Sequence, residues 1–454
     1  MTRLAIWLDD APIGWVGHDP ALNLFSFDYA GTWTAAKHAF AISPRLPLKK
    51  EPEQSPEKHS AEVRQFFENL LPEGEALDHA AQAYGISKAN LVGLMFALGK
   101  ETAGALRVLM EAGTAEDAAD SPPVRAAVSD ANQLRRVTQE ELSERIRRRA
   151  ERPFSVWDGK VRLSIAGYQD KIAIYERDSE WFLVEGPRLA STVIVKPVPA
   201  RPALASLPYN EYFCMQLAQR VGVKAANTRV ATVPEPVLLV SRFDRLERAD
   251  RVERLHLIDG CQALGLPVSM KYERPYGDGV DVRNIRDGVT YAKLFDLIAR
   301  FSMQPAIDKL ALLQWVIFQV LIGNTDAHGK NLSFFVNAAG LTLAPAYDMV
   351  CVPALDDAQL GNTYAMAIGD AFTADALSAF EWASFAKDNG LSGALVGRQI
   401  KLLADLVLKA LPGVGGDPVV PDAVKHRITE VVQENCARQL AMADMVAQVR
   451  AEDL

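Results

Sequence analysis

The chain has 454 residues, of which 49% are hydrophobic and 23% charged, and its 49 basic and 57 acidic side chains give a formal net charge of −8. These proportions are ordinary for a globular protein and exclude a chain that is disordered throughout. The acidic balance also argues against a protein whose main activity is to grip nucleic acid, because such affinity comes largely from neutralised phosphates. Any contact with DNA is therefore expected to be local or made through a partner.

The sequence predicts a soluble cytoplasmic protein with no membrane span. Its most apolar stretch, residues 311–323, contains two Gln and is shorter than the roughly 20 apolar residues that a spanning helix needs. The first residues reach Asp9 and Asp10 before any long apolar region, which is unlike a secretion signal. The cysteines are far apart and form no CxxC pair, so we expect reduced thiols rather than disulfides or a zinc site. They are Cys214, Cys261, Cys351 and Cys436.

Residues 1–110 are predicted to form a small mixed α/β domain. Apolar and aromatic runs indicate strands, a segment rich in Pro and charge indicates a loop, and helical spacing of apolar residues indicates a helix that ends at Pro72-Glu73-Gly74. Two further short helices are expected before Gly99. In chain order these expectations are strands over 4–8 and 22–27, the loop over 42–57 and the helix over 59–71.

The rest of the chain is predicted to be a linker followed by two lobes. Residues 111–135 begin with a small, polar, Pro-containing stretch typical of a linker, and a helix is expected over 138–149. Residues 136–260 are β-rich and residues 261–454 α-rich, so a ligand is expected in the cleft between two lobes. The expected strands cover 161–165, 171–176, 181–185, 191–197 and 237–243, and the expected helices cover 210–221, 291–300, 309–322, 382–388, 394–410 and 421–449.

The strongest pattern for chemistry lies in residues 322–336 (IGNTDAHGKNLSFFV). An apolar helix is expected to end at Gly323, and the polar turn after it presents Asp326 and, five positions later, Asn331. Two short strands should then form a hairpin whose second strand, LTLAPAYD, ends at Asp348. This hairpin would return Asp348 to a place beside Asn331.

An amide and two carboxylates that converge in this way suit phosphoryl transfer. Metal ions that bridge nucleotide phosphates prefer oxygen ligands, here Asn331 and Asp348. Asp326 is predicted to orient the accepting hydroxyl and to take its proton. The D-x4-N spacing is common by itself, but with a later metal-binding Asp it matches the protein-kinase catalytic loop.

The β-rich lobe should supply a cation and a loop that covers the phosphates. Lys196 ends the apolar strand TVIVK, and Glu211, at the start of the next helix, is placed to pair with it. The alternatives are a Lys that caps an edge strand and a Glu that is favoured there by the helix dipole. Residues 164–171 (SIAGYQDK) can close over phosphates through backbone N–H groups and Lys171, although with one Gly the segment is also compatible with an ordinary β-turn.

Seven segments of this chain resemble, in the same order, the HipA-like serine/threonine kinases, the toxins of bacterial toxin–antitoxin pairs. They are SIAGYQDK, VIVKP, NEYFCMQLA, SRFDR, CQALG, IGNTDAHGKN and APAYDM. FFENLLPEG and ALGKETAGAL are similar to that family's small leading domain. The resemblance covers nearly the whole chain and implies an α+β, two-lobed protein-kinase-like fold, with a β-rich N-lobe, an α-rich C-lobe and a small mixed N-terminal domain.

The resemblance implies Asp326 as the catalytic base, Asn331 and Asp348 as ligands of Mg²⁺, and ATP as the phosphate donor. It implies nucleotide contacts from Ala166, Gly167, Tyr168, Gln169, Asp170, Lys171, Lys196, Ile258, Asp259, Gly260, His328, Lys330 and Tyr347. Only backbone recognition of adenine is transferred to residues 258–260, because the family usually has an acidic pair before CQALG. His328 is given no catalytic role, since a His in such a loop is equally well bonded to the backbone.

The resemblance also implies a regulated toxin. Ser164 occupies the position of a loop serine whose phosphorylation switches the family's enzymes off, although an ordinary strand hydroxyl is the alternative. The expected substrate is a translation factor such as an aminoacyl-tRNA synthetase, the glutamate enzyme by resemblance. The expected partner is a helix-turn-helix antitoxin, through which DNA would be contacted only indirectly. The competing interpretations are a small-molecule kinase on the same scaffold and a non-catalytic module that bridges an antitoxin and DNA.

Overall fold

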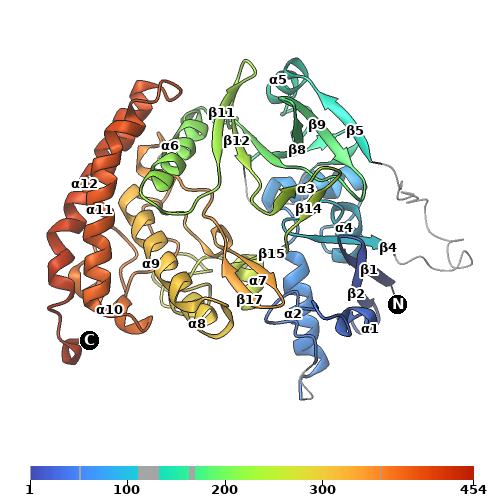
Figure 1. Ribbon diagram of the computed structural model, residues 1–454, viewed down its shortest axis with the longest axis horizontal. Coiled ribbons are helices and arrows are strands. Elements are labelled where there is room, and N and C mark those ends of the chain that lie inside the picture. The colour runs from blue at the N-terminus through green and yellow to red at the C-terminus, as the bar shows by residue number, and fades with distance from the viewer. Residues whose placement is uncertain (1, 51–52, 111–131, 163–168, 358) are drawn as a thin grey trace, which may run out of the picture. The chain divides into compact units, whose positions relative to one another are not determined.

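The computed structural model describes residues 2–50, 53–110, 132–162, 169–357 and 359–454 (Figure 1). The chain falls into two compact units and passes between them several times. The first unit comprises Met1–Val195, Ser241–Ile258 and Val336–Ala338, and the second comprises Lys196–Val240, Asp259–Phe335 and Ala339–Leu454. Helices and strands occur throughout, as the predicted α+β class requires. The finer division into a leading domain, a linker and two lobes stays a prediction, and most of the linker lies outside the described residues.

The first unit begins with an antiparallel sheet in the order β3-β2-β1-β4, covered by helix α2. Val63, Phe66 and Phe67 of α2 are buried, and the ring of Phe67 lies 6.0 Å from that of Phe27 on β3. Ser55 caps α2 and Pro56 takes its first position, so the helix begins before the predicted residue 59. These elements are β1 (Thr2–Leu8), β2 (Ala11–Asp19), β3 (Leu24–Tyr29), β4 (Leu106–Met110) and α2 (Pro56–Glu68).

Three short helices complete this part of the first unit, among them the two expected before Gly99. They are α1 (Gly31–Thr34), α3 (Gly74–Tyr84) and α4 (Leu91–Leu98). The predicted strand over 22–27 begins later than expected, because Asp19 accepts a hydrogen bond from the N–H of Ala21 and winds a turn there. Leu22 therefore stays on the surface, 68% exposed.

A second group of strands is ordered β10-β8-β9-β5 and belongs to the first unit, except for the last two residues of β10, Lys196 and Pro197, which belong to the second. Helix α5 follows β5 directly and is capped by Thr138, whose hydroxyl accepts from the N–H of Glu141. The elements are β5 (Gln133–Val137), α5 (Gln139–Arg147), β6 (Val156–Trp157), β7 (Lys160–Val161), β8 (Ile172–Arg177), β9 (Glu180–Glu185), β10 (Val193–Pro197), β13 (Arg245–Glu247) and β14 (Val252–Arg254). The predicted strand over 161–165 falls largely outside the described residues.

The second unit is built around helix α9, which α8, α11 and α12 contact. In Figure 1, α11 and α12 run side by side over much of their length. Its elements are α6 (Leu207–Arg220), β11 (Thr228–Thr232), β12 (Pro236–Ser241), α7 (Gly260–Leu264), α8 (Tyr291–Phe301), α9 (Pro305–Ile322), β17 (Gly340–Leu343), α10 (Ala379–Asp388), α11 (Gly393–Gly415) and α12 (Asp422–Val446). Strands β15 (Leu257–Asp259) and β16 (Ser333–Asn337) are divided between the units. All four cysteines lie buried in this unit as free thiols, as predicted.

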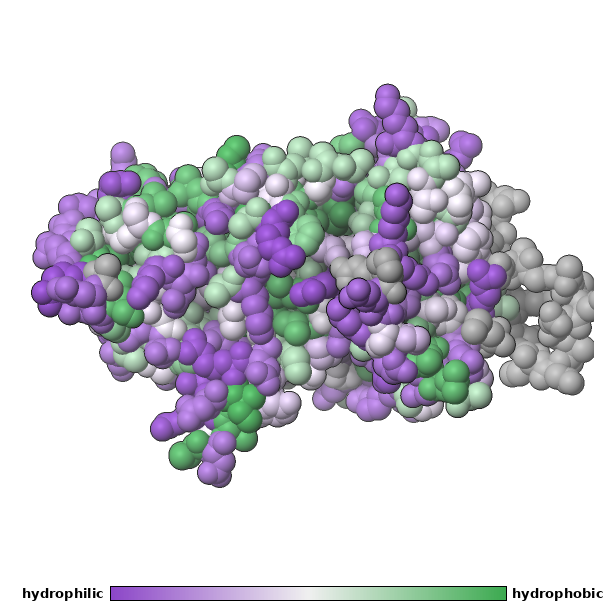
Figure 2. Space-filling view, turned by 90° about the horizontal axis from the view of Figure 1, so that it is seen from below, coloured by the Kyte–Doolittle hydropathy of each residue, from purple (hydrophilic) through white to green (hydrophobic). Residues whose placement is uncertain are grey.

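Among the described residues, α9 is the one helix that by length and composition alone is able to cross a membrane. Over Pro305–Ile322, 61% of this helix is buried, as expected for the core helix of a packed unit. The face of the molecule drawn in Figure 2 is largely hydrophilic, and its hydrophobic residues form separate groups. The burial of α9 agrees with a core helix.

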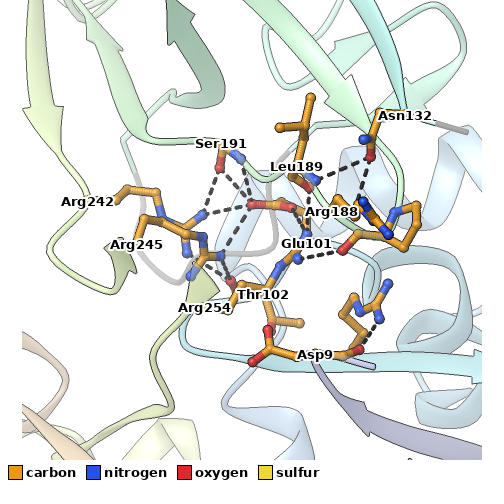
Figure 3. A network of polar contacts seen from close by, with 12 residues as sticks. Asp9, Glu101, Thr102, Asn132, Arg188, Leu189, Ser191, Arg242, Arg245 and Arg254 are labelled. Carbon is orange, nitrogen blue, oxygen red and sulfur yellow. Dashed lines mark hydrogen bonds and ion pairs between the residues drawn. The ribbon is translucent and has the colours of Figure 1, made fainter. Parts of the chain in front are cut away.

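A network of ion pairs inside the first unit joins two segments that are far apart in the sequence (Figure 3). The carboxylate of Glu101 lies 3.2 Å from Arg242, 3.3 Å from Arg245 and 3.5 Å from Arg254. Asp244 pairs with Arg242 and Arg245 and accepts a hydrogen bond of 2.7 Å from the N–H of Gly104. The segments ALGKETAGAL and SRFDR, whose role the sequence left open, thus meet in one network.

Glycine is required at residue 104 in this network. Its φ is +74°, and a Cβ there would stand 2.6 Å from the carbonyl oxygen of Leu257. The close approach leaves the N–H and the C=O of Gly104 to bond with Asp244 and Arg245. The backbone at Gly104 is thereby held by the charged side chains of Asp244 and Arg245.

The network makes Glu101 a determinant of stability. Burial alone would raise the pKa of Glu101, but Arg245, Arg254 and Arg242 outweigh it and lower the pKa to about 2. We expect Glu101→Gln to lower the free energy of unfolding by about 3 kcal/mol at pH 7, because it leaves the guanidinium groups short of a partner. Glu253→Gln, which removes a carboxylate from a surface pair with Arg248 and Arg251, should change it little.

The pH dependence tests the electrostatic origin of this effect. A carboxylate with a lowered pKa stabilises the fold above its unfolded pKa of about 4.5 and loses that contribution as the pH falls toward 2. The difference between wild type and Glu101→Gln should therefore shrink below pH about 4.5 in urea titrations. A difference that is the same at pH 7 and pH 3.5 would contradict this origin.

Candidate active site

The predicted catalytic turn directly follows the end of α9. Gly323 ends the helix with a φ of 69°, a conformation that glycine adopts without strain. The side chain of Asn324 then accepts a hydrogen bond of 3.1 Å from the N–H of Asp326. The carbonyl oxygen of Asp326 accepts from the N–H of His328 and from Nδ2 of Asn331, both at 2.9 Å. The turn thus holds the main chain of Asp326 from three sides, while its carboxylate is exposed.

Asp348 reaches this turn, but by a different route from the one predicted. The hairpin forms from β16 and β17, yet β17 ends at Leu343 instead of continuing to Asp348. Pro345 lacks an N–H and cannot extend the ladder. The next residue, Ala346, exchanges hydrogen bonds with Lys224 and Ala226. The chain therefore changes its pairing partner before it returns to the turn.

Tyr347 brings the chain back to the turn. Its hydroxyl donates to the carbonyl oxygen of Lys330 at 2.6 Å and lies 2.7 Å from the hydroxyl of Ser333. Asp348 follows with a φ of 58°, and its charge acts on the buried ring of His328. Asp326, Asn331 and Asp348 thus belong to one arrangement within the second unit.

Lys196 lies between two carboxylates in the same unit. Its Nζ is 2.7 and 2.9 Å from the oxygens of Glu211 on α6 and 2.7 Å from Oδ1 of Asp348. Lys196 is 7% exposed and Glu211 1%. Burial alone would lower the pKa of Lys196, but Asp348 and Glu211 outweigh it and raise the pKa, so the ammonium keeps its charge. The pairing with Glu211 is the one expected from the sequence, whereas the contact with Asp348 was not anticipated.

The residues of the predicted adenine hinge carry structural bonds of their own. Asp259 caps α7 through a bond of 2.8 Å from the N–H of Gln262, and its second oxygen lies 2.5 Å from Nζ of Lys330. The N–H of Gly260 donates to the carbonyl oxygen of Leu332 at 3.0 Å, and Ile258 is 1% exposed. The Asp259 side chain and the Gly260 N–H thus stabilise the site from within, and their contact with a nucleotide stays a prediction.

His328 is a buried, neutral imidazole. Burial, Lys271 and Lys330 lower its pKa to about 3, against a smaller opposite effect of Asp348. Its ring stands edge-on to that of Tyr272, with the centroids 5.1 Å apart. These surroundings suit packing and positioning, in keeping with the absence of a catalytic role for His328 in the sequence prediction.

The predicted phosphate loop is described only in part. Ser164, Ala166, Gly167 and Tyr168 lie outside the described residues. Gln169, Asp170 and Lys171 belong to the first unit. There burial raises the pKa of Asp170, against the opposing charges of Arg149 and His79.

The donor atoms of the second unit suit a hard divalent cation bound together with phosphates. No group of three or more His, Cys, Asp or Glu side chains in the described part of the chain is placed to hold a metal by itself. Mg²⁺ does not need such a group, because it commonly keeps several waters and takes one or two protein oxygens plus phosphate oxygens. Asn331 uses Nδ2 for its bond to Asp326, which leaves the Oδ1 end of the amide to face a ligand. By their chemistry, this amide oxygen and the carboxylate of Asp348 are oxygen ligands of the kind that Mg²⁺ accepts.

Sequence reasoning missed one segment of the site, residues 270–273. The carbonyl oxygen of Lys271 accepts a hydrogen bond of 2.9 Å from the N–H of Gly329. The hydroxyl of Tyr272 donates to Oδ1 of Asp326 at 2.7 Å. Asp326 lies 54 positions after Tyr272, and no local sequence pattern encodes a pairing over that distance. The available signal was an isolated Lys-Tyr-Glu between the apolar end of α7 and a Gly-rich, charged stretch.

Gly260 allows α7 to approach the catalytic turn closely. A Cβ on Gly260 would stand 2.5 Å from the carbonyl oxygen of Gly329, a backbone atom that cannot rotate away. We expect Gly260→Ala to lower the free energy of unfolding by about 1–3 kcal/mol and the thermal midpoint with it. Gly279→Ala, in an exposed loop where the nearest atom is 3.6 Å away, should leave the midpoint within a degree or so. Equal midpoints for both variants in calorimetry would contradict the close approach.

Comparisons with known proteins identify the same family as the sequence motifs do, over nearly the whole chain. The HipA N-terminal domain family matches residues 4–109, and the HipA-like C-terminal domain family matches residues 163–412. The serine/threonine-protein kinase toxin HipA of Shewanella oneidensis is 35% identical over 456 residues, which cover 98% of each chain. A solved structure of the Shewanella oneidensis toxin–antitoxin complex of HipA, HipB and operator DNA matches with a TM-score of 0.84 and 34% identity, over 99% of this chain and 100% of that chain. This likeness confirms the predicted kinase-like fold, and the chain belongs to the HipA family of serine/threonine kinase toxins.

Proposed function

We propose that this kinase transfers the γ-phosphate of Mg–ATP to a serine or threonine of a translation factor, an aminoacyl-tRNA synthetase such as that for glutamate, and thereby inhibits growth in the cytoplasm. The observation that carries the proposal is the arrangement in the second unit. There an exposed carboxylate, Asp326, follows a rigid turn, and a buried ammonium, Lys196, is held by Glu211 and Asp348. This is the set of groups that phosphoryl transfer needs.

Each residue has a distinct part in the proposed reaction. Asp326 would orient the substrate hydroxyl and accept its proton. Asn331 and Asp348 would hold Mg²⁺, which when bound neutralises charge on the phosphates. Lys196 would contact the phosphates, with Glu211 fixing its ammonium.

The charge of the site supports a cation–nucleotide ligand. The Lys196 ammonium lies between two carboxylates, those of Glu211 and Asp348, so these three groups carry one net negative charge. A divalent cation is needed to balance this excess of negative charge before a polyphosphate can approach. We therefore expect ATP to bind with its metal.

Removing the proton acceptor should abolish the activity. We expect Asp326→Asn to lower phosphate transfer by at least about 100-fold and to relieve growth inhibition. The thermal midpoint should stay unchanged, because the side chain is exposed. The measurement is transfer of label from γ-labelled ATP to proteins of a whole-cell lysate, together with growth after induction.

Asp296→Asn serves as the matched control for this experiment. Asp296 forms a surface pair with Arg300 on α8 and should tolerate the change without loss of transfer. Unchanged transfer in Asp326→Asn would reject the assigned role. Label that enters small molecules instead of a discrete protein band would favour a small-molecule kinase.

A small helix-turn-helix antitoxin is the proposed partner. The support is the solved Shewanella oneidensis complex, which holds HipA together with HipB and operator DNA. A net charge of −8 makes direct binding of this chain to DNA a poor source of affinity. We therefore propose that the antitoxin supplies the main contact with DNA.

We further propose that phosphorylation of Ser164 limits the activity. A phosphate adds about −1.5 to −2 charge, which would repel ATP from a loop meant to bind polyphosphate. Mass spectrometry of protein made with ATP available should find phosphate on Ser164 in wild type and lose it in Asp326→Asn. Ser164→Ala should keep or raise transfer. An unmodified Ser164 beside other labelled sites would refute this switch.

A further inference from the structure

We infer that Tyr272 is a positioning residue that fixes the carboxylate of Asp326 for catalysis, an inference that rests on the proposed function of Asp326. The hydroxyl of Tyr272 donates to Oδ1 of Asp326 at 2.7 Å. Hydrogen bonds to a charged acceptor of this length are among the stronger ones in proteins. The contact is made by a segment outside both the catalytic turn and the metal-binding residues.

The bonds from the turn to the N–H and carbonyl group of Asp326 fix its main chain. Its N–H and carbonyl bonds involve Asn324, His328 and Asn331, and none of these bonds restrains the side-chain torsions. An exposed carboxylate can otherwise exchange between rotamers and water contacts. A fixed donor on Oδ1 selects one orientation, and such preorganisation is what a general base needs.

Tyr272 is itself held rigidly. Its neighbour Lys271 accepts a hydrogen bond from the N–H of Gly329, which joins this segment to the catalytic turn. Glu273 donates its N–H to the carbonyl oxygen of Ala365 at 2.9 Å, and its buried carboxylate accepts from the N–H of Ala367 at 2.7 Å. A donor with bonds on both sides has little freedom to follow a mobile carboxylate, so it is the carboxylate that is placed.

The ring of Tyr272 adds a second constraint. It stands edge-on, at 88°, to the imidazole of His328, two residues after Asp326. Edge-to-face contacts between aromatic rings are favourable and directional. The phenol is therefore anchored to the same turn as the carboxylate to which it donates.

The proposed role requires no proton from Tyr272. In the transfer step the substrate oxygen bonds to the γ-phosphorus, the bond from that phosphorus to the bridging oxygen breaks, and ADP leaves. The proton of the substrate hydroxyl passes to Asp326, while Tyr272 keeps its own. Two carboxylate oxygens offer about four acceptor sites, so the bond from Tyr272 is compatible with acceptance from the substrate.

The test is Tyr272→Phe in the full-length protein, assayed by label transfer from ATP to a lysate protein. Loss of one hydrogen bond to a charged group should lower kcat by about 10- to 100-fold, with the KM for ATP within about threefold of wild type. Phe keeps the ring against His328, so the thermal midpoint should be preserved. Tyr276→Phe is the control, because Tyr276 lies four positions further along the chain, is 59% exposed and should leave kcat unchanged.

A double variant separates positioning from general stability. In the Asp326→Asn background, Tyr272→Phe should lower the residual rate by less than about threefold, because the phenol acts through the carboxylate. A full effect in that background, or a fall in kcat matched by a rise in the KM for ATP and a lower midpoint, would assign Tyr272 a structural role and overturn the inference.

Two other results would also overturn it. Equal kcat values for wild type and Tyr272→Phe would show that the bond is unimportant, and a faster variant would show that the phenol competes with the substrate. Failure of the proposed function is distinguishable, because wild type itself would then transfer no label to protein.

Discussion

The site depends on a buried ammonium that is shared by two carboxylates. Lys196, Glu211 and Asp348 come from a strand, a helix and an irregular segment, and 152 residues separate the lysine from its more distant partner. A buried charge is costly unless it is paired, so the protonated lysine requires both carboxylates to be near it. The position of Asp348 beside the catalytic turn is thus tied to the position of α6, which carries Glu211.

In the first unit, the network around Glu101 likewise consists of buried charges that are paired with one another. Charged groups that lie inside a protein specify their partners more narrowly than apolar groups do, because an unpaired charge is far less tolerable than a small gap. Asp244, for example, is an acidic residue that is only 5% exposed, and it is paired there with two arginines. Both units therefore use ion pairs where two distant segments of chain have to meet.

Local pattern was sufficient for the parts of the fold that local physics decides. The end of α9 at Gly323, the hairpin after Asn331 and the helix that carries Glu211 follow from stop signals and periodicity. Strand β2 was missed because Pro12 and two glycines break its apolar alternation, and pairing with β1 and β3 supplies what its sequence lacks. Strand β5 was missed because two arginines occupy the middle of a five-residue strand.

Within the candidate site, too, some contacts follow from local sequence and others arise only from the packing of distant segments. Asp326 and Asn331 lie in one turn, so their spacing alone places them together. The path of the chain to Asp348 depends on a change of pairing partner after Pro345, and the bond from Tyr272 depends on a segment 54 residues earlier. Neither contact leaves a periodic trace in the sequence, because each arises only when packed elements meet.

The glycines at the base of the site have a mechanical consequence. Gly260 faces the carbonyl oxygen of Gly329, and a Cβ on Gly329 would itself stand 2.5 Å from the side chain of Val289. The backbones of Gly260 and Gly329 are thus packed directly against each other, and the side chain of Val289 packs against Gly329 from the segment before α8. Because a shift of Gly260, the turn or the segment before α8 would have to displace the others, we expect shape changes that regulate this enzyme to leave the turn intact and to alter access to it.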